Sequence, residues 1–174
     1  MLWDKLYWKL FIMNKLFLFS LLFLLLACES KNPEYEANLS THKQLVTELN
    51  AFYSNPDSAS LDISDFFTDD FLFYYFPAGS PKGVETSKSE YFEILQNLKN
   101  SGFVIKIGHS IYLPGIDEHT HKVDGSIRLY YGVTVRKENS VALSAYRTIN
   151  FENGKISGIW EWADYGGLTK QLYD

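Results

Sequence analysis

Hydrophobic and polar positions follow two different periods along this chain, and the period changes at Phe103. Before that residue, apolar side chains recur three and four positions apart, which is the spacing of amphipathic helices. After it they recur at every second position, as in strands that bury one face. Helices therefore come first and strands come last. This order is typical of α+β folds in which helices cover one face of a sheet.

The first half of the chain is expected to hold three helical segments and one aromatic strand. Thr41 is a candidate cap for the first helix, and Ser87 or Ser89 for the third. The expected elements are helices over His42–Tyr53, around Ser60–Thr68 and after Ser87 or Ser89, and a strand over Phe71–Phe76.

The second half is expected to form an antiparallel meander of long strands. The Asn153-Gly154 step is a strong hairpin signal between the last two strands. A short helix around Leu168–Leu172 follows. The expected strands are Phe103–Leu113, Ile127–Lys137, Val141–Phe151 and Lys155–Ala163. The pattern predicts an α+β fold with N-terminal helices packed on a curved antiparallel sheet.

An apolar run from Leu16 to Ala27 follows neither period and ends at Cys28, the single cysteine. A basic start, a short hydrophobic core and small residues before a cleavage point indicate a secretory signal peptide. Spanning a bilayer takes about twenty apolar residues, which the run lacks. Leu25-Leu26-Ala27-Cys28 resembles a bacterial lipobox. This resemblance implies cleavage before Cys28 and lipid attachment to its thiol, with an uncleaved anchor or a core helix as the alternative.

The signal divides the chain into a signal peptide over residues 1–27, a polar tether over 28–40 and a domain over 41–174. Met13 followed by Asn14 and Lys15 would start a compact signal by itself, so we expect the true start at Met13. The mature protein is expected in a bacterial cell envelope, attached through Cys28 on the periplasmic side or at the outer membrane.

The composition of the mature chain indicates which classes of partner and chemistry to expect. The signal holds three Lys and one Asp, so thirteen basic and twenty acidic residues remain and the net charge is −7. Such a surface disfavours nucleic acid. With Cys28 acylated, no thiol is left for a disulfide, a metal site or a nucleophile. The 17% aromatic content suits a ligand pocket as well as a core. No cofactor and no metal is expected, because Asp117–His121 has the composition of a solvated loop.

Strand alternation places four polar residues within apolar rows. If these rows face the helices, the polar side chains converge inside the cone that the curved sheet forms. Two tryptophans in the row of the last strand would lie beside them. The polar residues are His109, Tyr131, Arg147 and Asp164, and the tryptophans are Trp160 and Trp162. An aromatic pocket with a few convergent polar groups is the usual form of a ligand site.

The order of elements and the closing segment resemble the nuclear-transport-factor-two-like (SnoaL-like) cone fold. Phe151–Ile156, Trp160–Asp164 and Leu168–Leu172 are similar to that family's last strand and tail, and Phe66–Phe71 to the entry of its first strand. The resemblance implies a cystatin-like cone and a superfamily of isomerases, cyclases, dehydratases, hydrolases and non-enzymatic binders.

The same resemblance implies a candidate catalytic set. Asp164 stands where similar polyketide cyclases carry an acidic residue and would act as the base, with His109 as its partner or the acid and Tyr131 as an oxyanion donor. The structural alternative is that Asp164 caps the terminal turn, that Arg147 pairs with Asp164 or Glu161, and that His109 is a core histidine.

Three functions follow from these observations. The favoured one is a non-catalytic lipoprotein that binds a small apolar ligand or a protein partner in its cone. The alternatives are an acid–base enzyme of the isomerase, cyclase or dehydratase type that uses Asp164 and His109, and a structural role at the envelope. The outer sheet face, rich in tyrosine at Tyr112, Tyr130 and Tyr146, suggests a homodimer.

Overall fold

The computed structural model describes Lys15 and residues 32–55, 57 and 60–173. The chain forms two compact units, Met1–Lys31 and Asn32–Asp174. The predicted signal peptide and Cys28 therefore lie outside the described residues, apart from Lys15. The fold and site below belong to the second unit. Among the described residues, no helix has the length and hydropathy that crossing a bilayer requires.

Helices and two strands precede the meander of four strands, as the change of period predicted. The elements in chain order are α2 (Pro33–Ser54), the 3-10 turn η1 (Ser64–Phe66), β1 (Phe67–Tyr75), β2 (Val84–Ser87), α3 (Lys88–Asn100), β3 (Val104–Ile116), β4 (Val123–Arg136), β5 (Ser140–Glu152), β6 (Lys155–Ala163) and α4 (Tyr165–Tyr173). The α+β class is confirmed.

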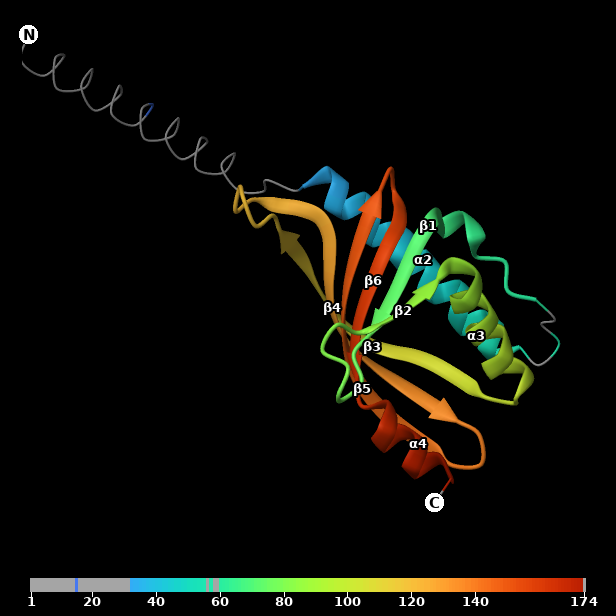
Figure 1. Ribbon diagram of the computed structural model, residues 1–174. Coiled ribbons are helices and arrows are strands. Elements are labelled where there is room, and N and C mark those ends of the chain that lie inside the picture. Colours follow the sequence, from blue (N-terminus) through green and yellow to red (C-terminus); the bar gives the residue numbers. More distant parts are fainter. Residues whose placement is uncertain (1–14, 16–31, 56, 58–59, 174) are drawn as a thin grey trace, which may run out of the picture. The chain divides into compact units, whose positions relative to one another are not determined.

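The strands form one six-stranded sheet in the order β2-β1-β6-β5-β4-β3. The four long strands pair antiparallel with their sequence neighbours, as predicted. However, β1 pairs parallel with β6, so the sheet is mixed rather than wholly antiparallel. A parallel pair needs a long connection, which α3 and the meander supply between β1 and β6. The long strands bend along their length, and helices α2 and α3 lie against the sheet (Figure 1).

Helix α2 begins at Pro33, well before the predicted cap at Thr41. The side chain of Asn32 accepts a hydrogen bond from the backbone N–H of Tyr35 and so caps the helix. Proline suits the first turn, where its missing N–H is not needed. Residues 33–40, predicted as part of a polar tether, are therefore helical, and the Asn32-Pro33 pair was the signal for this start.

The predicted second helix around Ser60–Thr68 is wrong beyond the single turn η1. Strand β1 begins at Phe67, which pairs with Ile156 of β6. Tertiary pairing thus takes over where the local pattern favoured a helix. The third helix starts at Ser87, whose hydroxyl accepts from the N–H of Glu90 while the Glu90 carboxylate accepts from the N–H of Ser87. This capping box fixes the start of α3.

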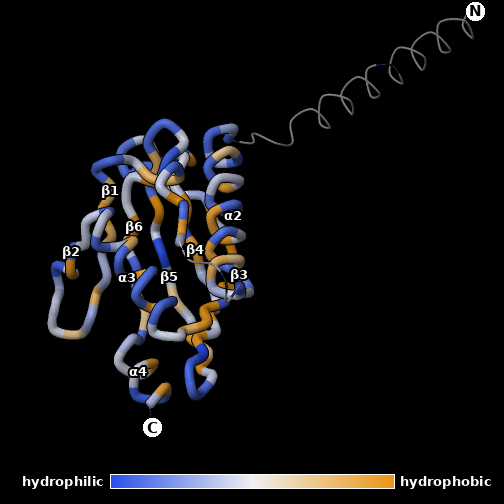
Figure 2. The backbone as a smooth tube through the Cα atoms, turned by 90° about the vertical axis from the view of Figure 1, so that its right-hand side faces the viewer, coloured by the Kyte–Doolittle hydropathy of each residue, from blue (hydrophilic) through white to orange (hydrophobic). Residues whose placement is uncertain are grey.

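The core lies between the helices and the inner face of the sheet. In Figure 2 hydrophobic positions recur along β1, β4 and β6, while hydrophilic ones gather in the connecting turns. The most deeply buried apolar side chains are Ile63, Phe67, Phe71, Ile127, Leu129, Ile149, Ile156 and Ile159. This core supports the inner face on which the candidate site is built.

Candidate functional site

An extra residue in β3 reverses the alternation of its side chains before His109 reaches the interior. Ile107 pairs with Val133, but Ser110 pairs with Tyr131, so β3 carries one residue more than β4 between these pairs. Such a bulge re-aims the side chains that follow it. Ile107 consequently lines the inner cavity, whereas His109 is exposed. The expectation that His109 points into the cone is wrong, and Gly108 marks the bulge.

A second bulge, in β6, moves the tryptophans to the outer face. Asn150 pairs with Gly158 and Phe151 with Ile156, which leaves Ser157 as the extra residue. The inner face therefore continues through Ile159 and Glu161 rather than through Trp160 and Trp162, and the expectation that the tryptophans line the pocket is wrong. Outside, Trp162 stacks on Phe76 with ring centroids 4.5 Å apart, and Trp160 stacks on Tyr74 at 5.5 Å.

Asp164 lies at the junction of β6 and α4 and is exposed. Its Oδ1 accepts a hydrogen bond of 2.8 Å from the backbone N–H of Gly167. The carboxylate thus caps the first turn of α4, where a negative charge stabilises a helix start. Asp164 and His109 do not line the cavity, so the structure does not bring the candidate catalytic pair together there.

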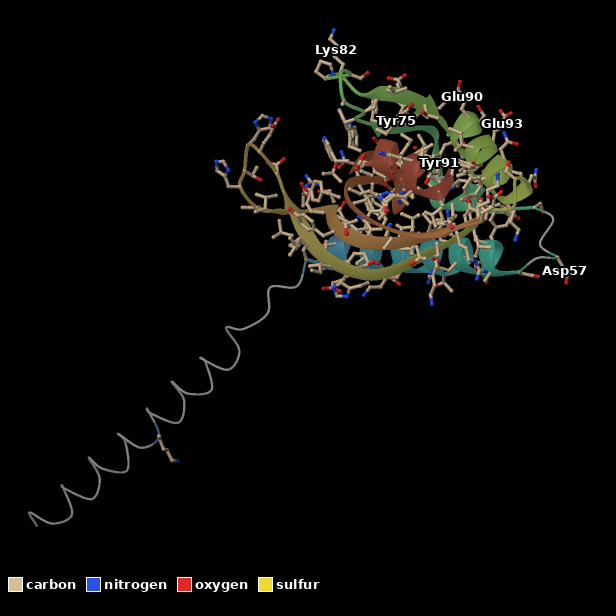
Figure 3. The ribbon with its side chains drawn as sticks, turned by 90° about the horizontal axis from the view of Figure 1, so that it is seen from below. Asp57, Tyr75, Lys82, Glu90, Tyr91 and Glu93 are labelled. Atoms are coloured by element: carbon tan, nitrogen blue, oxygen red, sulfur yellow. The ribbon has the colours of Figure 1, made fainter. Side chains whose placement is uncertain are left out.

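A partly open cavity of about 620 Å³ lies on the inner face of the sheet, and Tyr131 and Arg147 both line it. Most of its wall is apolar, with a set of tyrosines among the apolar side chains. The apolar residues include Leu49, Phe73, Leu95, Ile105, Val133 and Leu143, and the tyrosines are Tyr53, Tyr75, Tyr91, Tyr131, Tyr165 and Tyr173. Figure 3 shows Tyr75 and Tyr91 directed toward the interior, while Glu90 and Glu93 of the same helix as Tyr91 point outward.

The polar centre of the cavity is Glu161, which is 2% exposed. Its Oε2 accepts hydrogen bonds from the hydroxyl of Tyr131 and from Nε of Arg147, and its Oε1 accepts from the hydroxyl of Tyr165. The Arg147 guanidinium also lies over the Tyr131 ring, 4.8 Å from its centroid. We call Tyr131, Arg147, Glu161 and Tyr165 the Glu161 cluster.

Burial governs the protonation of the groups in the Glu161 cluster. Burial raises the pKa of the Tyr131 hydroxyl well above its ordinary value, although the charge of Arg147 acts in the opposite direction. The pKa of the neighbouring Tyr91 is raised for the same reason. Burial, the largest single influence, lowers the pKa of Arg147, but the Glu161 charge, the Tyr131 and Tyr91 hydroxyls and the hydrogen bond to Glu161 together outweigh it, so the pKa rises. Both tyrosines therefore stay neutral, and Arg147 stays charged.

Sequence reasoning missed Glu161 as a site residue because strict alternation placed it outside. The signal was Gly158, since glycine within a strand often marks a bulge. A Cβ at this position would lie 2.6 Å from the Trp160 ring. Tyr165 of α4 and Tyr91 of α3 were also missed. Alternation along the strands does not show which helix residues will face the sheet.

Acidic and imidazole side chains do not gather into a metal site within the part of the chain that the structure describes, where no group of three or more His, Cys, Asp or Glu lies close enough. In the loop between β3 and β4, Oδ1 of Asp117 accepts from the backbone N–H groups of His119 and Thr120. The exposed loop is thus a hydrogen-bonded turn.

No known sequence family and no curated protein sequence matches this chain. Solved structures do. A protein from Jannaschia described as a SnoaL-like polyketide cyclase is 11% identical, with a TM-score of 0.57 over 83% of this chain and 96% of that one. The BvnE pinacolase of Penicillium brevicompactum is 13% identical, with a TM-score of 0.57 over 83% and 94%.

An LEH-like epoxide hydrolase from M. tuberculosis is 14% identical, with a TM-score of 0.52 over 81% of this chain and 92% of that one. At these identities the likeness concerns the fold. The domain has the nuclear-transport-factor-two-like, SnoaL-like cone fold, in agreement with the resemblance of its closing segment. Fold alone does not assign a function, which has to be argued from the site.

Proposed function

We propose that this protein binds a small, neutral and largely apolar molecule in its cone, and that a lipid on Cys28 holds it at a bacterial cell envelope. The observation that carries the binding proposal is the cavity of about 620 Å³, whose wall is mostly apolar and carries the Glu161 cluster. Ligand pockets usually measure about 300–1,000 Å³ and combine apolar walls with a few fixed polar groups.

The Glu161 cluster favours a neutral ligand. Arg147 carries a positive charge that Glu161 already neutralises at contact distance. A ligand carboxylate would have to displace Glu161 or share one guanidinium with it, and either arrangement leaves a buried charge without a full partner. A ketone or hydroxyl can exchange hydrogen bonds with the tyrosine hydroxyls at a smaller cost in desolvation.

Hydrogen bonding within the cluster favours binding over catalysis. Both carboxylate oxygens of Glu161 already accept hydrogen bonds, from Tyr131, Arg147 and Tyr165. A general base needs a lone pair within reach of the proton that it removes. Three donors thus hold the Glu161 carboxylate in one orientation, which supports a binding role.

A second candidate is acid–base catalysis by Glu161, and a specific observation favours it. Tyr165 donates to Oε1 from α4, the last helix, and the other two donors use Oε2. A ligand that displaced the Tyr165 hydroxyl would free Oε1 to take a proton inside an apolar cavity. The similar folds named as a cyclase, a pinacolase and an epoxide hydrolase are enzymes, so turnover should be measured together with binding.

A matched pair of probes tests the binding proposal. We expect 2-acetonaphthone, a neutral ketone, to bind in calorimetry and raise the Tm, and 2-naphthoate to bind at least tenfold more weakly. Val133→Phe fills the cavity from β4 and should abolish ketone binding. Its neighbour Thr134 is exposed, so Thr134→Phe should leave binding unchanged. No ketone binding, equal binding of both probes, or binding that survives Val133→Phe contradicts the proposal.

Attachment to the envelope is tested separately. Metabolic labelling with an alkyne fatty acid should mark the full chain, and Cys28→Ser should remove both the label and the membrane association. A Cys28→Ser protein that still sediments with membranes contradicts the lipid anchor.

The homodimer stays a prediction. Tyr130 is 52% exposed and Trp162 is 41% exposed on the outer sheet face. The expectation that Tyr112 lies on that face is wrong, because its ring contacts buried His42 of α2 and packs against the core. Sedimentation velocity of the detergent-solubilised protein should show a dimer that Trp162→Lys dissociates.

A further inference from the structure

We propose that the end of the β3–β4 hairpin is a membrane-contacting surface that rests in the lipid headgroup region. Ile116 and Val123 form the last strand pair there, before the polar turn 117–122, and Leu113 lies behind them. This inference rests on the proposed lipid attachment at Cys28. It adds an orientation, because it states which part of the domain meets the bilayer.

The hairpin end exposes large apolar side chains. Ile116 is 60% exposed, Val123 43% and Leu113 46%. Ile116 and Val123 are paired across the two strands, so they form one small apolar surface. Isolated exposed apolar residues are common. Three of them at one hairpin end need a reason, and the place of this end in the chain supplies one.

The hairpin end is joined to the start of the described domain. Nδ2 of Asn32 donates a hydrogen bond of 2.8 Å to the carbonyl of Val123, and Nδ2 of the buried Asn38 donates to the carbonyl of Gly125 at 2.8 Å. The beginning of α2 is thereby fixed on the first residues of β4. Whatever holds the chain at Asn32 also holds Val123.

The chain between the anchor and this junction is short. Only Glu29, Ser30 and Lys31 separate Cys28 from Asn32. Four peptide steps reach at most about 14 Å in any conformation. The headgroup layer on each side of a bilayer is itself about 5–8 Å thick. A lipid on Cys28 would therefore keep Asn32, and Val123 with it, close to the lipid surface.

The early start of α2 limits how far the domain can stand from its lipid anchor. A tether reaching to residue 40 would let the domain stand away from the membrane, but α2 begins at Pro33. The helix is rigid from there, so little free chain remains to separate the domain from its anchor.

The charges at the hairpin end indicate what kind of contact forms. The loop carries Asp117 and Glu118 against Lys122, so attraction to anionic lipid is not expected. The contact is apolar and shallow, with Ile116 and Val123 among the headgroups. It should form equally on zwitterionic vesicles.

Site-specific labels test the orientation in the full, acylated protein. Cys28 is the single cysteine, and its thiol is blocked by the lipid, so a bimane label reacts only with an introduced cysteine. The variants are Ile116→Cys, Leu113→Cys and, as a control on the exposed face of α3, Glu93→Cys. The protein is reconstituted in phosphatidylcholine vesicles that carry nitroxide lipids.

We expect at least twofold stronger quenching by headgroup nitroxides at position 116 than at position 93, with position 113 between them. Iodide in the water should quench in the opposite order. Unchanged Tm values show that the variants are folded. Equal quenching at positions 116 and 93 in acylated, vesicle-bound protein overturns the inference and leaves the anchor intact. Absence of acylation and of vesicle binding overturns the anchor and the inference together.

Discussion

Arg147 and Glu161 are register partners on β5 and β6, and their side chains form an ion pair in the interior of the fold. The side chain of Glu161 is 2% exposed and that of Arg147 is 14% exposed. Burying two charges is costly unless each finds its partners. Here the Glu161 carboxylate accepts hydrogen bonds from Arg147 and from two tyrosine hydroxyls. A buried, hydrogen-bonded ion pair in the wall of a mostly apolar cavity can also orient the polar group of a ligand.

Breaking this ion pair should destabilise the fold far more than replacing it. Glu161→Leu leaves the Arg147 charge unpaired, so we expect a loss of about 3–5 kcal/mol in the free energy of unfolding. The double variant Arg147→Met with Glu161→Leu should recover most of that loss, because no buried charge remains. Urea denaturation of the four proteins of the cycle measures both values. Additive effects of the two changes would show that the ion pair is not coupled.

Much of the fold was predictable because it depends on local pattern. The four long strands, the Asn153-Gly154 hairpin and the start of α3 at Ser87 follow from alternation, turn chemistry and capping. The parallel pairing of β1 with β6 was not predictable in this way. Such pairing depends on contacts between segments far apart in the sequence, which no local pattern records.

The site was predictable only as far as alternation stayed intact. Tyr131 and Arg147 lie on β4 and β5, where the bulges of β3 and β6 add no residue, and both line the cavity. His109 and Trp162 lie beyond a bulge, and a shift of one residue moves a side chain to the other face. Glu161 reaches the interior through the same shift. Gly108 and Gly158 were the available signals, although glycine in a strand does not state which residue is extra.

Gly158→Ala should damage the bulge that aims Glu161 inward. The new Cβ would lie 2.6 Å from the Trp160 ring, so the ring has to leave its stack on Tyr74. We expect a loss of about 1–3 kcal/mol in the free energy of unfolding. The control is Gly132→Ala, whose Cβ meets nothing closer than 4.0 Å. Equal Tm values for the two variants would contradict this account of the bulge.

Asn32 is expected to matter through two separate hydrogen bonds. Its Oδ1 caps α2, and its Nδ2 donates to the carbonyl of Val123. Asn32→Ala removes both and should cost about 1–2 kcal/mol. Asn32→Asp keeps the cap but loses the donor, so it should fall between the wild type and Asn32→Ala. Thermal unfolding compares the three. If Asn32→Asp equals the wild type, the bond to Val123 contributes nothing to stability.

His42 should make the fold sensitive to acid. Its side chain is 1% exposed, packs edge-to-face on the Tyr112 ring at 5.7 Å, and its Nδ1 has no hydrogen-bond partner among the described residues. Burial, and then the charge of Arg147, lower the pKa of His42 from 6.5 to about 3. Lys43, the next residue of α2, lies over the Tyr112 ring, 5.4 Å from its centroid. The Arg147 charge opposes a positive charge on His42.

The direction of the pH effect follows from that lowered pKa. Above pH 6.5 His42 is neutral in the folded and the unfolded chain, so its contribution to stability is complete. As the pH falls from 6.5 toward 3, His42 binds a proton in the unfolded chain but stays neutral in the folded chain. The free energy of unfolding should then fall by about 1.4 kcal/mol per pH unit. In His42→Phe the contribution of His42 to the slope of unfolding free energy against pH should vanish. The contribution from protonation of the carboxylates should remain. Urea denaturation of both proteins between pH 7 and 4 measures the difference, and parallel pH profiles would contradict a neutral, buried His42.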